Sequence, residues 1–298
     1  MRILVFGSIN RDLTFRVPRI AAPGETLASL SLTEHPGGKG LNQAVALSRA
    51  GGDVFFAGCC GPDGEGLLRL MEGERIDTRF IRRTGTPTGQ AMIQVSNDGE
   101  NAIVLYPGAN REIREADVSA ALDFFSPGDF LVLQNEINGL PFLLKEAAGK
   151  GLRTVLNPSP CTKDLRALDS SLLSVLLVNE GEACFLTGCP DAASAVRTLR
   201  TACPQLTGAV TLGKKGAVGF SAAEEVFQPA FSVPAVDTTG AGDTFTGYFL
   251  VSLTQGLPLA DCLRRASAAA ALAVGRPGAA SSIPAAAETD AFLRRLSL

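Results

Sequence analysis

The sequence predicts an α/β fold in which helices flank a central, mainly parallel β-sheet and a small second β-sheet forms a lid. Short, continuously apolar segments alternate with segments of helical hydrophobic spacing, a pattern typical of parallel strands buried on both faces. Two pairs of additional strands interrupt this alternation, at about 13–35 and 88–106. Because 298 residues suit one α/β unit of this kind, we expect a single domain over 1–298.

The N-terminal part of the chain combines the first buried strand with the lid strands. Ile3–Phe6 is an apolar run that ends at Gly7 and is typical of a buried strand. The lid strands are expected at Leu13–Val17 and Leu27–Thr33 around a turn at Pro23-Gly24, and at Thr88–Val95 and Asn101–Tyr106 around a turn at Asn97-Asp98-Gly99. A sheet of this kind can cover a ligand cleft and present an apolar face to a second subunit.

Strands and helices then alternate along the rest of the chain. Strands are expected at Val54–Ala57, Phe130–Leu133, Thr154–Leu156 and Leu172–Val178, and helices at Gly66–Met71, Ala116–Phe125, Leu140–Ala148 and Glu182–Leu186. An antiparallel pair at Ala217–Phe220 and Val226–Phe231 is expected at the sheet edge, followed by helices at Leu259–Val274 and Ala285–Leu296.

Composition argues against several classes of protein. The formal net charge is −3, so no broad basic field would attract nucleic acid or an anionic membrane. The seven cysteines form no C-x-x-C pair, and a single histidine does not complete a zinc site of the usual kind. The apolar runs are far shorter than the roughly 20 residues of a membrane span. We therefore expect a soluble, cytoplasmic protein with free thiols that acts on small molecules.

Polar residues follow several of the predicted strands. Asn10 and Asp12 follow the first strand, and later clusters lie at 134–136, 157–160, 179–182 and 211–216. Because the carboxyl ends of parallel strands meet at one edge of the sheet, these clusters predict a cleft along that edge. Turn formation alone would also explain Asn10 and Asp12, since Asn and Asp are common after strands.

A glycine-rich segment with a lysine, His35-Pro36-Gly37-Gly38-Lys39-Gly40-Leu41-Asn42, begins a predicted helix that stops at Gly51-Gly52. Glycines let the backbone approach a ligand closely, so Lys39 and Asn42 would face a polyol with charged and amide donors. A plain helix start with a solvated lysine is the alternative.

The most informative motif is Asp237-Thr238-Thr239-Gly240-Ala241-Gly242-Asp243-Thr244-Phe245, which leads into a helix with apolar residues at 245, 249 and 253. Asp243 therefore falls in the first helical turn, beside the unpaired N–H groups of residues 240–243. Such groups bind anions, so a transferring phosphoryl group and a carboxylate base would share one turn. The alternative is a carboxylate that only stabilises the helix N-terminus.

Together these motifs resemble those of the ribokinase-like (PfkB) sugar kinases, and the resemblance covers nearly the whole chain. The matching segments are Gly7-Ser8-Ile9-Asn10-x-Asp12, Pro23-Gly24-Glu25-Thr26, Gly37-Gly38-Lys39-Gly40-x-Asn42-Gln43-Ala44, Gly108-Ala109-Asn110, Leu156-Asn157-Pro158, Asn179-Glu180-x-Glu182, Thr211-Leu212-Gly213 and Asp237–Phe245. The resemblance implies a ribokinase-like fold and ATP-dependent phosphorylation of a primary sugar hydroxyl group. For members that act on ribose, the product is ribose 5-phosphate.

The resemblance also implies a role for each site residue. Asp243 would be the base, beside an anion hole at Gly240, Ala241 and Gly242. The sugar would contact Asn10, Asp12, Gly38, Lys39, Asn42, Glu136 and Asp243. The nucleotide would contact Asn179, Thr211, Gly213, Lys214, Lys215, Gly216, Gly242 and Ser267, with Mg²⁺ held through water and phosphates near Asn179 and Glu182. A monovalent cation, usually potassium, would be held by Asp237, Thr239, Ala273, Arg276, Gly278 and Ser282.

Several readings stay open at this level. Tyr106 and Asn135 depart from the family pattern near the expected sugar cleft, so nucleoside, 2-keto-3-deoxygluconate and fructose acceptors stand beside ribose. A sugar-sensing protein without catalysis would need a broken anion hole, and residues 240–243 are intact. A dehydrogenase would need G-x-G-x-x-G after the first strand, where the sequence has Gly7-Ser8-Ile9-Asn10-Arg11-Asp12. We also expect the lid strands to pair across a two-fold axis in a homodimer.

Overall fold

The computed structural model describes residues 1–296 and contains a nine-stranded sheet in the order β13-β12-β11-β10-β9-β8-β1-β4-β5. The strands are β1 (Arg2–Phe6), β4 (Asp53–Cys60), β5 (Asp77–Arg83), β8 (Phe130–Gln134), β9 (Arg153–Asn157), β10 (Val175–Asn179), β11 (Thr207–Thr211), β12 (Gly216–Phe220) and β13 (Glu225–Pro229). Neighbours from β11 to β5 are parallel, and the β11–β12 and β12–β13 pairs are antiparallel. The predicted mainly parallel sheet with an antiparallel edge is therefore confirmed.

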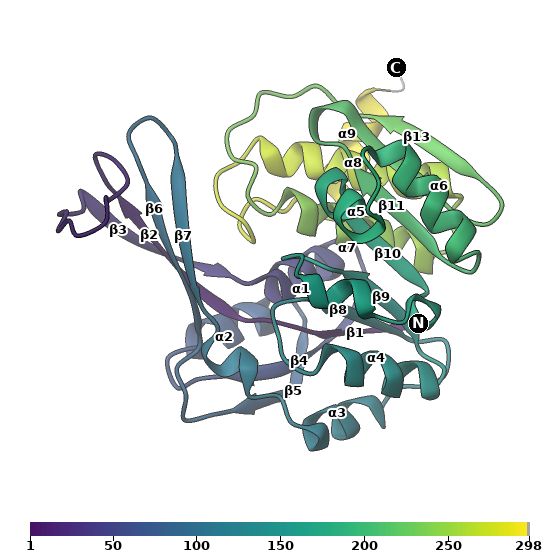
Figure 1. The fold of residues 1–298 in the computed structure, drawn as a ribbon, viewed down its shortest axis with the longest axis horizontal. Helices are drawn as coiled ribbons and strands as arrows, with labels where there is room; N and C mark the ends of the chain where they lie inside the picture. The colour runs from purple at the N-terminus through teal and green to yellow at the C-terminus, as the bar shows by residue number, and fades with distance from the viewer. Residues whose placement is uncertain (297–298) are drawn as a thin grey trace.

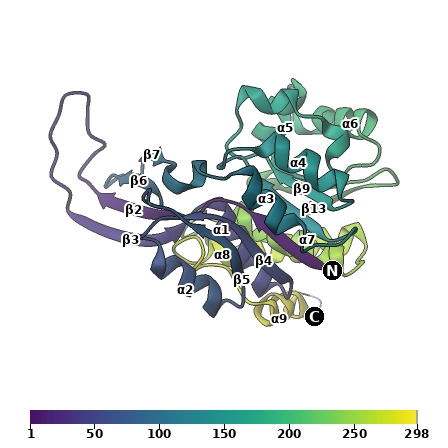
Figure 2. The ribbon, with the colours of Figure 1, turned by 90° about the horizontal axis from the view of Figure 1, so that it is seen from below.

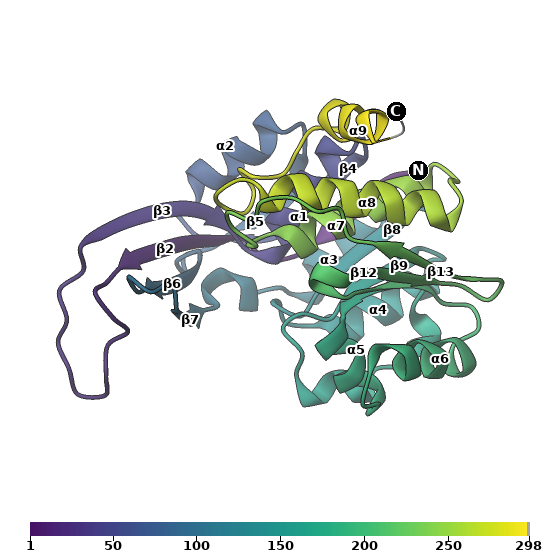
Figure 3. The same cartoon turned by 90° about the horizontal axis from the view of Figure 1, so that it is seen from above.

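Helices cover both faces of this sheet (Figure 3). One face carries α1 (Lys39–Arg49), α2 (Glu65–Gly73), α7 (Ala241–Thr254), α8 (Leu259–Val274) and α9 (Ala286–Arg295), and the other carries α3 (Glu115–Leu122), α4 (Leu140–Gly149), α5 (Glu180–Thr187) and α6 (Ala192–Ala202). Strand β1 serves both sides: Ile3 and Val5 join one apolar cluster, and Leu4 and Phe6 join the other. This alternation follows from the two-residue period of a strand.

A four-stranded sheet in the order β3-β2-β6-β7 projects from this body as the lid (Figures 1 and 2). Its strands are β2 (Asn10–Arg16), β3 (Ser31–Gly37), β6 (Gly89–Val95) and β7 (Asn101–Tyr106). β2 pairs antiparallel with β3 and parallel with β6, and β6 pairs antiparallel with β7. The predicted small second sheet is therefore confirmed, and β2 continues almost directly from the carboxyl end of β1.

The strand order reverses between β1 and β8. From β1 the chain adds β4 and β5 on one side of the sheet, and it later adds β8 to β11 on the other side. In open α/β sheets, ligands bind at the carboxyl edge where the strand order reverses in this way. The residues that follow β1 and β8 therefore mark the place where a site is expected. None of the helices in the described part of the chain combines the length and apolar character needed to cross a bilayer.

Some of the predicted strand bounds are wrong. The strand expected at Leu27–Thr33 runs from Ser31 to Gly37 instead, and its pairing with β2 begins at Arg16 and Ser31. The intervening segment forms a long, mostly exposed loop, because its prolines lack the N–H donor that a strand ladder needs. The turn at Pro23-Gly24 therefore lies inside a loop and does not form a tight hairpin.

Other differences concern short elements with local causes. Strand β10 begins at Val175, later than predicted, because Asp169 accepts the N–H of Ser171 at 3.0 Å and caps a short 3-10 turn. Helix α6 was missed, although Asp191 caps it by accepting the N–H of Ser194 at 2.8 Å. Strand β5 was also missed, because its charged sequence lacks an apolar run.

Candidate active site

Asp243 lies in the first turn of α7, as the sequence predicts. The N-cap residue Gly240 has φ 74°, a left-handed conformation that favours glycine. Ala241 donates its N–H to Thr238 O at 3.3 Å. The N–H groups of Gly240, Gly242 and Asp243 have no protein acceptor within residues 1–296. The free donors of the predicted anion hole therefore come from these three residues, and Ala241 contributes less than expected.

Close packing of α1 against α7 places two amide side chains beside Asp243. Gly247 permits this approach, because a Cβ atom there would lie 2.5 Å from Ala46 Cβ. Asn42 Nδ2 donates to Asp243 Oδ2 at 3.3 Å, and Gln43 Nε2 donates to Asp243 Oδ1 at 2.9 Å. Both carboxylate oxygens thus receive an N–H from α1, and Asp243 is only 7% exposed.

Further amides fix the side chain of Gln43. Gln134 ends β8 and donates its Nε2 to Gln43 Oε1 at 2.7 Å. Gln43 Nε2 also donates to Asn157 Oδ1 at 3.2 Å, and Asn157 Nδ2 donates to Leu177 O at 2.8 Å. Because Gln43 Oε1 is the acceptor toward Gln134, the Nε2 group must face Asp243.

The segments after β1 and β8 meet at Ser8 and Glu136. Ser8 Oγ donates to Glu136 Oε2 at 2.5 Å, and the same carboxylate oxygen accepts the N–H of Lys39 at 3.0 Å. Ser8 Oγ also accepts the N–H of Gly40 at 3.2 Å. These bonds orient Glu136 at the point where the strand order reverses.

Asn10 and Asp12 belong to the first lid strand, β2, which begins at Asn10. Asn110 Nδ2 donates to Asn10 Oδ1 at 2.8 Å, while Asn110 Oδ1 accepts the N–H of Ile9 at 2.9 Å. Because the carbonyl oxygen of Asn10 is already used, its Nδ2 group is oriented to donate to a ligand.

Besides Gln134 Oε1, two buried acceptor atoms in this region have no protein partner among residues 1–296: Asp12 Oδ1 and Asn42 Oδ1. Buried polar atoms are normally hydrogen-bonded, and leaving one unsatisfied is unfavourable. Both belong to residues that the sequence assigns to sugar hydroxyl groups. Burial, together with the nearby Glu136 carboxylate, raises the pKa of Asp12 to about 6.

Lys39 brings a positive charge into the same region. Burial alone would lower the pKa of its ammonium group, but the carboxylates of Asp243, Glu136 and Glu182 outweigh burial and raise it above its ordinary value. Lys39 lines a polar cavity of about 220 Å³ together with Asp243, Glu182, Asn179 and the N-terminus of α7. The cavity therefore combines a base, a cation and free backbone donors.

A larger, more apolar cavity of about 660 Å³ adjoins the first, and four residues line both: Thr211, Thr238, Gly242 and Phe245. The larger cavity is also lined by Ser267, Ala270, Ala271 and Val274 of α8, by Phe231, and by Gly213, Lys214 and Gly216 of the loop after β11. The small side chains of α8 suit a flat ring system. Lys215 instead lies 3.8 Å from Glu180 in an exposed ion pair.

Asn179 and Glu182 cap helix α5 reciprocally. Asn179 Oδ1 accepts the N–H of Glu182 at 2.8 Å, and Glu182 Oε2 accepts the N–H of Asn179 at 3.0 Å. Within residues 1–296, no group of three or more His, Cys, Asp or Glu side chains is arranged to hold a metal ion. The carboxylate of Glu182 lies beside the polar cavity and could contact a hydrated Mg²⁺ ion. The remaining ligands of such an ion are water and phosphate oxygens.

Most residues expected to hold a monovalent cation lie on two loops that Asp237 joins, and Ala273 lies in the last turn of α8. Asp237 Oδ1 accepts the N–H of Thr239 at 2.9 Å, and Asp237 Oδ2 accepts the N–H of Gly278 at 2.9 Å. Burial alone would raise the pKa of Asp237, but these hydrogen bonds outweigh it and lower the pKa. Ala273 O accepts the N–H of Arg276 at 3.0 Å. Carbonyl oxygens on adjacent loops suit a hard cation.

Ser282 belongs to the same group, and its hydroxyl donates to Ala279 O at 2.8 Å. Arg276 also forms an ion pair with Glu288 at 2.5 Å, which anchors the second loop to α9. The two loops that carry most of the predicted cation-binding residues are therefore held in place by side-chain contacts.

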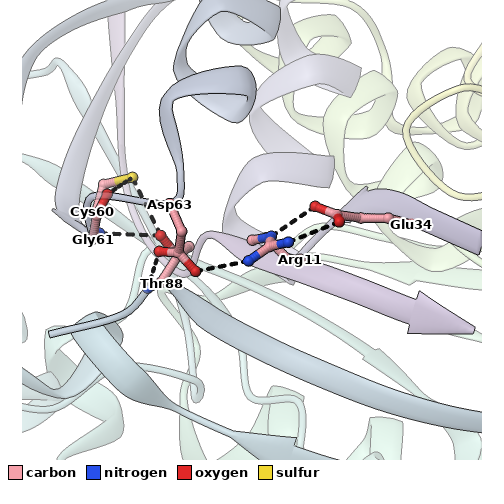
Figure 4. Close-up of polar contacts among 6 residues, drawn as sticks. All are labelled: Arg11, Glu34, Cys60, Gly61, Asp63 and Thr88. Carbon is pink, nitrogen blue, oxygen red and sulfur yellow. Dashed lines mark hydrogen bonds and ion pairs between the residues drawn. The ribbon is translucent and has the colours of Figure 1, made fainter.

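A set of polar contacts holds the base of the lid (Figure 4). Arg11 of β2 forms ion pairs with Glu34 of β3 at 2.6 Å and with Asp63, in the loop after β4, at 2.9 Å. The other oxygen of Asp63 accepts the N–H of Thr88, next to β6, at 2.8 Å, and Thr88 Oγ1 accepts the N–H of Gly61 at 3.1 Å. Asp63 thus contacts both central lid strands where they leave the body.

The two departures from the family pattern have defined places. Asn135 Nδ2 donates to Pro160 O at 2.7 Å and to Thr162 Oγ1 at 3.1 Å, so this side chain ties the loop after β9 to the end of β8. Tyr106 is the last residue of β7, opposite Gln90, and is 42% exposed.

Five residues with clear structural roles at the site were not assigned any role from the sequence: Ser8, Gln43, Asp63, Asn110 and Gln134. Three of them stand inside motif segments, immediately beside or near assigned residues, and Gln134 lies in a polar cluster after a strand. Motif membership was therefore the available signal for three of them, and position after a strand was the signal for Gln134. Asp63 lies outside these motif segments and polar clusters, so the sequence analysis had no signal for it.

Comparison with known proteins identifies relatives along the whole chain. Residues 1–286 match the model of the pfkB family carbohydrate kinases. The chain is 38% identical over 300 residues to a ribokinase of Haemophilus influenzae, with 98% of each chain covered. A ribokinase structure from Cryptococcus neoformans in complex with ADP has a TM-score of 0.85 and 34% identity, covering 99% of this chain and 98% of that chain. An Arabidopsis thaliana ribokinase complexed with ribose and ATP has a TM-score of 0.85 and 29% identity, with 98% of each chain covered.

Proposed function

The chain belongs to the pfkB family of carbohydrate kinases, and on this basis we propose that it transfers the γ-phosphoryl group of ATP to the 5-hydroxyl group of D-ribose, giving ribose 5-phosphate. The observation that carries the proposal is the position of Asp243. Its carboxylate lies in the first turn of α7 and is held by Asn42 and Gln43, and Asn42 also carries a buried acceptor without a partner. A hydroxyl acceptor and a phosphoryl group would therefore meet at this residue.

Asp243 acts as the base in this mechanism. A carboxylate is a weak base for an alcohol. A weak base suffices here, since phosphoryl transfer passes through a loose transition state and the hydroxyl group loses its proton late, as the new bond develops. Asp243 mainly orients the 5-hydroxyl group and then accepts its proton.

Charge on the moving phosphoryl group is stabilised by donors that already point into the polar cavity. The free N–H groups of Gly240, Gly242 and Asp243 form the anion hole, and the ammonium group of Lys39 adds a positive charge. Preorganised donors of this kind usually supply the largest single contribution to catalysis. Lys214 lines the adjoining cavity, where the nucleotide phosphates would enter.

The sugar hydroxyl groups bind between the lid and the body. Asp12 Oδ1, Asn42 Oδ1 and Glu136 accept hydrogen bonds from hydroxyl groups, whereas Asn10 Nδ2 donates one. The backbone of Gly38 lies at the start of α1, beside Asn10. A polyol with adjacent hydroxyl groups would satisfy the buried acceptors, which supports a pentose in this place.

The adenine ring occupies the larger cavity. The small residues Ala270 and Ala271 let the ring lie close to α8, with Ser267 as its polar neighbour and Thr211, Gly213 and Gly216 around it. Mg²⁺ near Asn179 and Glu182 would supply charge neutralisation on the phosphates when bound. A potassium ion at the loops of residues 237–239 and 273–282 would supply positive charge behind the anion hole.

We also propose that the protein acts in the cytoplasm as a homodimer. All seven cysteines are free thiols, which suits a reducing compartment. The lid strand β7 presents Ile103, Val104 and Leu105 at 53%, 59% and 50% exposure on an open sheet edge. A second lid would bury these side chains.

A coupled ATP-turnover assay tests this proposal directly. The acceptors are ribose, 2-deoxyribose, fructose, adenosine and 2-keto-3-deoxygluconate, each measured with and without potassium ions. Ribose turnover that potassium increases is the expected outcome. A clear preference for another acceptor would be consistent with the mechanism but would contradict ribose as the substrate. The absence of turnover with every acceptor would favour the sugar-sensing alternative.

A further inference from the structure

We propose that Gln43 is a positioning residue that holds the Asp243 carboxylate in the orientation needed to accept the proton of the sugar hydroxyl group. The inference rests on the proposed function and extends it to a side chain that is fully buried, at 0% exposure. Gln43 acts through Asp243 and does not line the polar cavity described above.

The direction of the hydrogen bonds carries this inference. Gln134 Nε2 donates to Gln43 Oε1 at 2.7 Å, which leaves Gln43 Nε2 to donate to Asp243 Oδ1 at 2.9 Å. Reversing the amide of Gln43 would set its oxygen against the carboxylate and its NH₂ group against the NH₂ group of Gln134. Because the Asp243 carboxylate only accepts, it permits this one orientation of Gln43, and Gln134, whose Oε1 has no partner among residues 1–296, presents the matching NH₂ group.

The two oxygens of Asp243 are held unequally. Gln43 binds Oδ1 at 2.9 Å, whereas Asn42 binds Oδ2 at the longer distance of 3.3 Å. Asn42 also carries one of the buried acceptors without a partner, so it faces the sugar side. Asp243 Oδ2 is accordingly the oxygen that receives the hydroxyl proton, and Gln43 prevents the carboxylate from rotating.

Rotation matters because the terminal torsion of an aspartate is soft. A charge-assisted hydrogen bond in a buried site is strong and directional, so it can fix this torsion. The second bond of Gln43, to Asn157 Oδ1 at 3.2 Å, ties the same amide to the end of β9. Through Gln43, the orientation of the Asp243 carboxylate is thus fixed relative to the central sheet.

The substitution Gln43→Glu tests the donor itself. It keeps the size of the side chain and still accepts from Gln134, but it replaces Nε2 with an oxygen. At pH 8 we expect kcat with ribose to fall at least about tenfold, with the ribose KM changed less than about threefold. At lower pH the introduced carboxyl group becomes protonated and can donate again, so the ratio of mutant to wild-type kcat should rise as the pH falls. A purely structural role would not produce this recovery.

A second variant and a matched control complete the experiment. Gln134→Leu removes the donor that orients the Gln43 amide, and we expect a smaller loss of kcat without recovery at low pH. Ser48→Ala lies on the same helix and removes a hydrogen bond to Glu74 O at 2.5 Å, far along α1 from Asp243. It should leave kcat unchanged.

The outcomes separate this inference from the proposed function. If the wild-type protein does not phosphorylate ribose, the proposed function fails. If the wild-type protein is active and both Gln43→Glu and Gln134→Leu keep its kcat, the positioning role is overturned. Should Gln43→Glu not fold, Gln43→Met replaces it as an apolar variant of similar length, and unchanged kcat in that variant would equally overturn the role.

Discussion

Asp243 concentrates the proposed chemistry in one side chain, because the base and the anion hole share the first turn of α7. We predict that Asp243→Asn lowers kcat by about 10²–10⁴-fold, the range for loss of a general base, while sugar binding and thermal stability are retained. Steady-state kinetics, ribose calorimetry and thermal unfolding measure the three quantities. A variant with near-normal kcat would rule out Asp243 as the base.

Asp12 should make both stability and sugar binding depend on pH. Burial and Glu136 raise the pKa of Asp12 to about 6 in the folded protein, above the ordinary value of an unfolded chain. The folded state then binds the proton of Asp12 more tightly than the unfolded chain does. The free energy of unfolding therefore decreases as the pH rises from about 4 to about 6, and it stays lower above pH 6. Ionised Asp12 is also the form that accepts two hydroxyl hydrogen bonds, so the ribose affinity should fall below about pH 6.

The variant Asp12→Asn checks this linkage. Without the buried charge, we expect the ligand-free variant to gain up to about 3 kcal/mol of stability at pH 8 and roughly half of that at pH 5. Its ribose KM should rise at least about tenfold, since an acceptor is replaced by a donor. Thermal unfolding at the two pH values and ribose kinetics provide the measurements. Equal stability gains at both pH values would contradict the raised pKa.

The sequence predicted individual site residues better than the contacts between them. The place of Asp243 in a first helical turn follows from local glycines and spacing, and the structure confirms it. Its partner Gln43 is 200 positions away along the chain, so this contact depends on how closely α1 packs against α7. No local sequence pattern predicts how closely these two helices pack. The weaker contribution of Ala241 to the anion hole likewise depends on the carbonyl direction of Thr238.

Among the elements, the lid depends on Asp63. Side chains alternate along β2, so Asn10 and Asp12 face one side of the strand and Arg11 faces the other, toward Asp63. One carboxylate therefore connects the body of the protein to the strand that carries Asn10 and Asp12, which are proposed to bind the sugar. The pKa of Asp63 is lowered to about 2: burial alone would raise it, but hydrogen bonds from Thr88 and Arg11 outweigh burial. The stabilisation that Asp63 contributes is present above the pKa of an unfolded aspartate and is lost only as the pH falls toward 2.

We predict that Asp63→Ala loosens the base of the lid. The ribose KM should rise about five- to tenfold, because the sugar must then order Asn10 and Asp12 on binding. The increase should be constant from pH 5 to 9, and ADP affinity should not change. Hydrogen exchange in β2 and β6 should become faster. Lys150→Ala, which removes an exposed ion pair with Asp123 on the body, is the control. Unchanged exchange in both lid strands would show that Asp63 does not hold them.

The elements that the sequence predicted well are those with a continuous apolar run or a clear helical period. The four-residue core of β1 and the long helix α8 fall where expected. The loop between β2 and β3 is longer than the predicted connection around Pro23-Gly24, because a Pro-Gly pair indicates a turn but not the length of chain around it. Strand β5 was missed since a charged edge strand is defined by its neighbour β4 and not by its own composition.

Among the described residues, three edge strands carry exposed apolar side chains, namely β3 and β7 of the lid and β13 of the body, and the β7 edge is proposed to form the dimer. Val104 of β7 is 59% exposed and Phe227 of β13 is 56% exposed. Val104 lies opposite Met92 of β6, which is 39% exposed, so two exposed apolar side chains adjoin on one face of the lid, whereas Phe227 lies opposite the half-buried Val218 of β12.

We therefore predict that the wild-type protein sediments as a dimer at micromolar concentration and that Val104→Lys converts it to a monomer, because a charge in the centre of the shared surface would be buried without a partner. Phe227→Lys, which places the same charge on the other edge at similar exposure, should leave the dimer intact. If the lid of each subunit is ordered by its partner, the monomeric variant also has a higher ribose KM while its ADP affinity is unchanged. A monomeric wild-type protein would contradict the predicted dimer. A dimer that persists in Val104→Lys and dissociates in Phe227→Lys would show that the subunits do not associate through the lid.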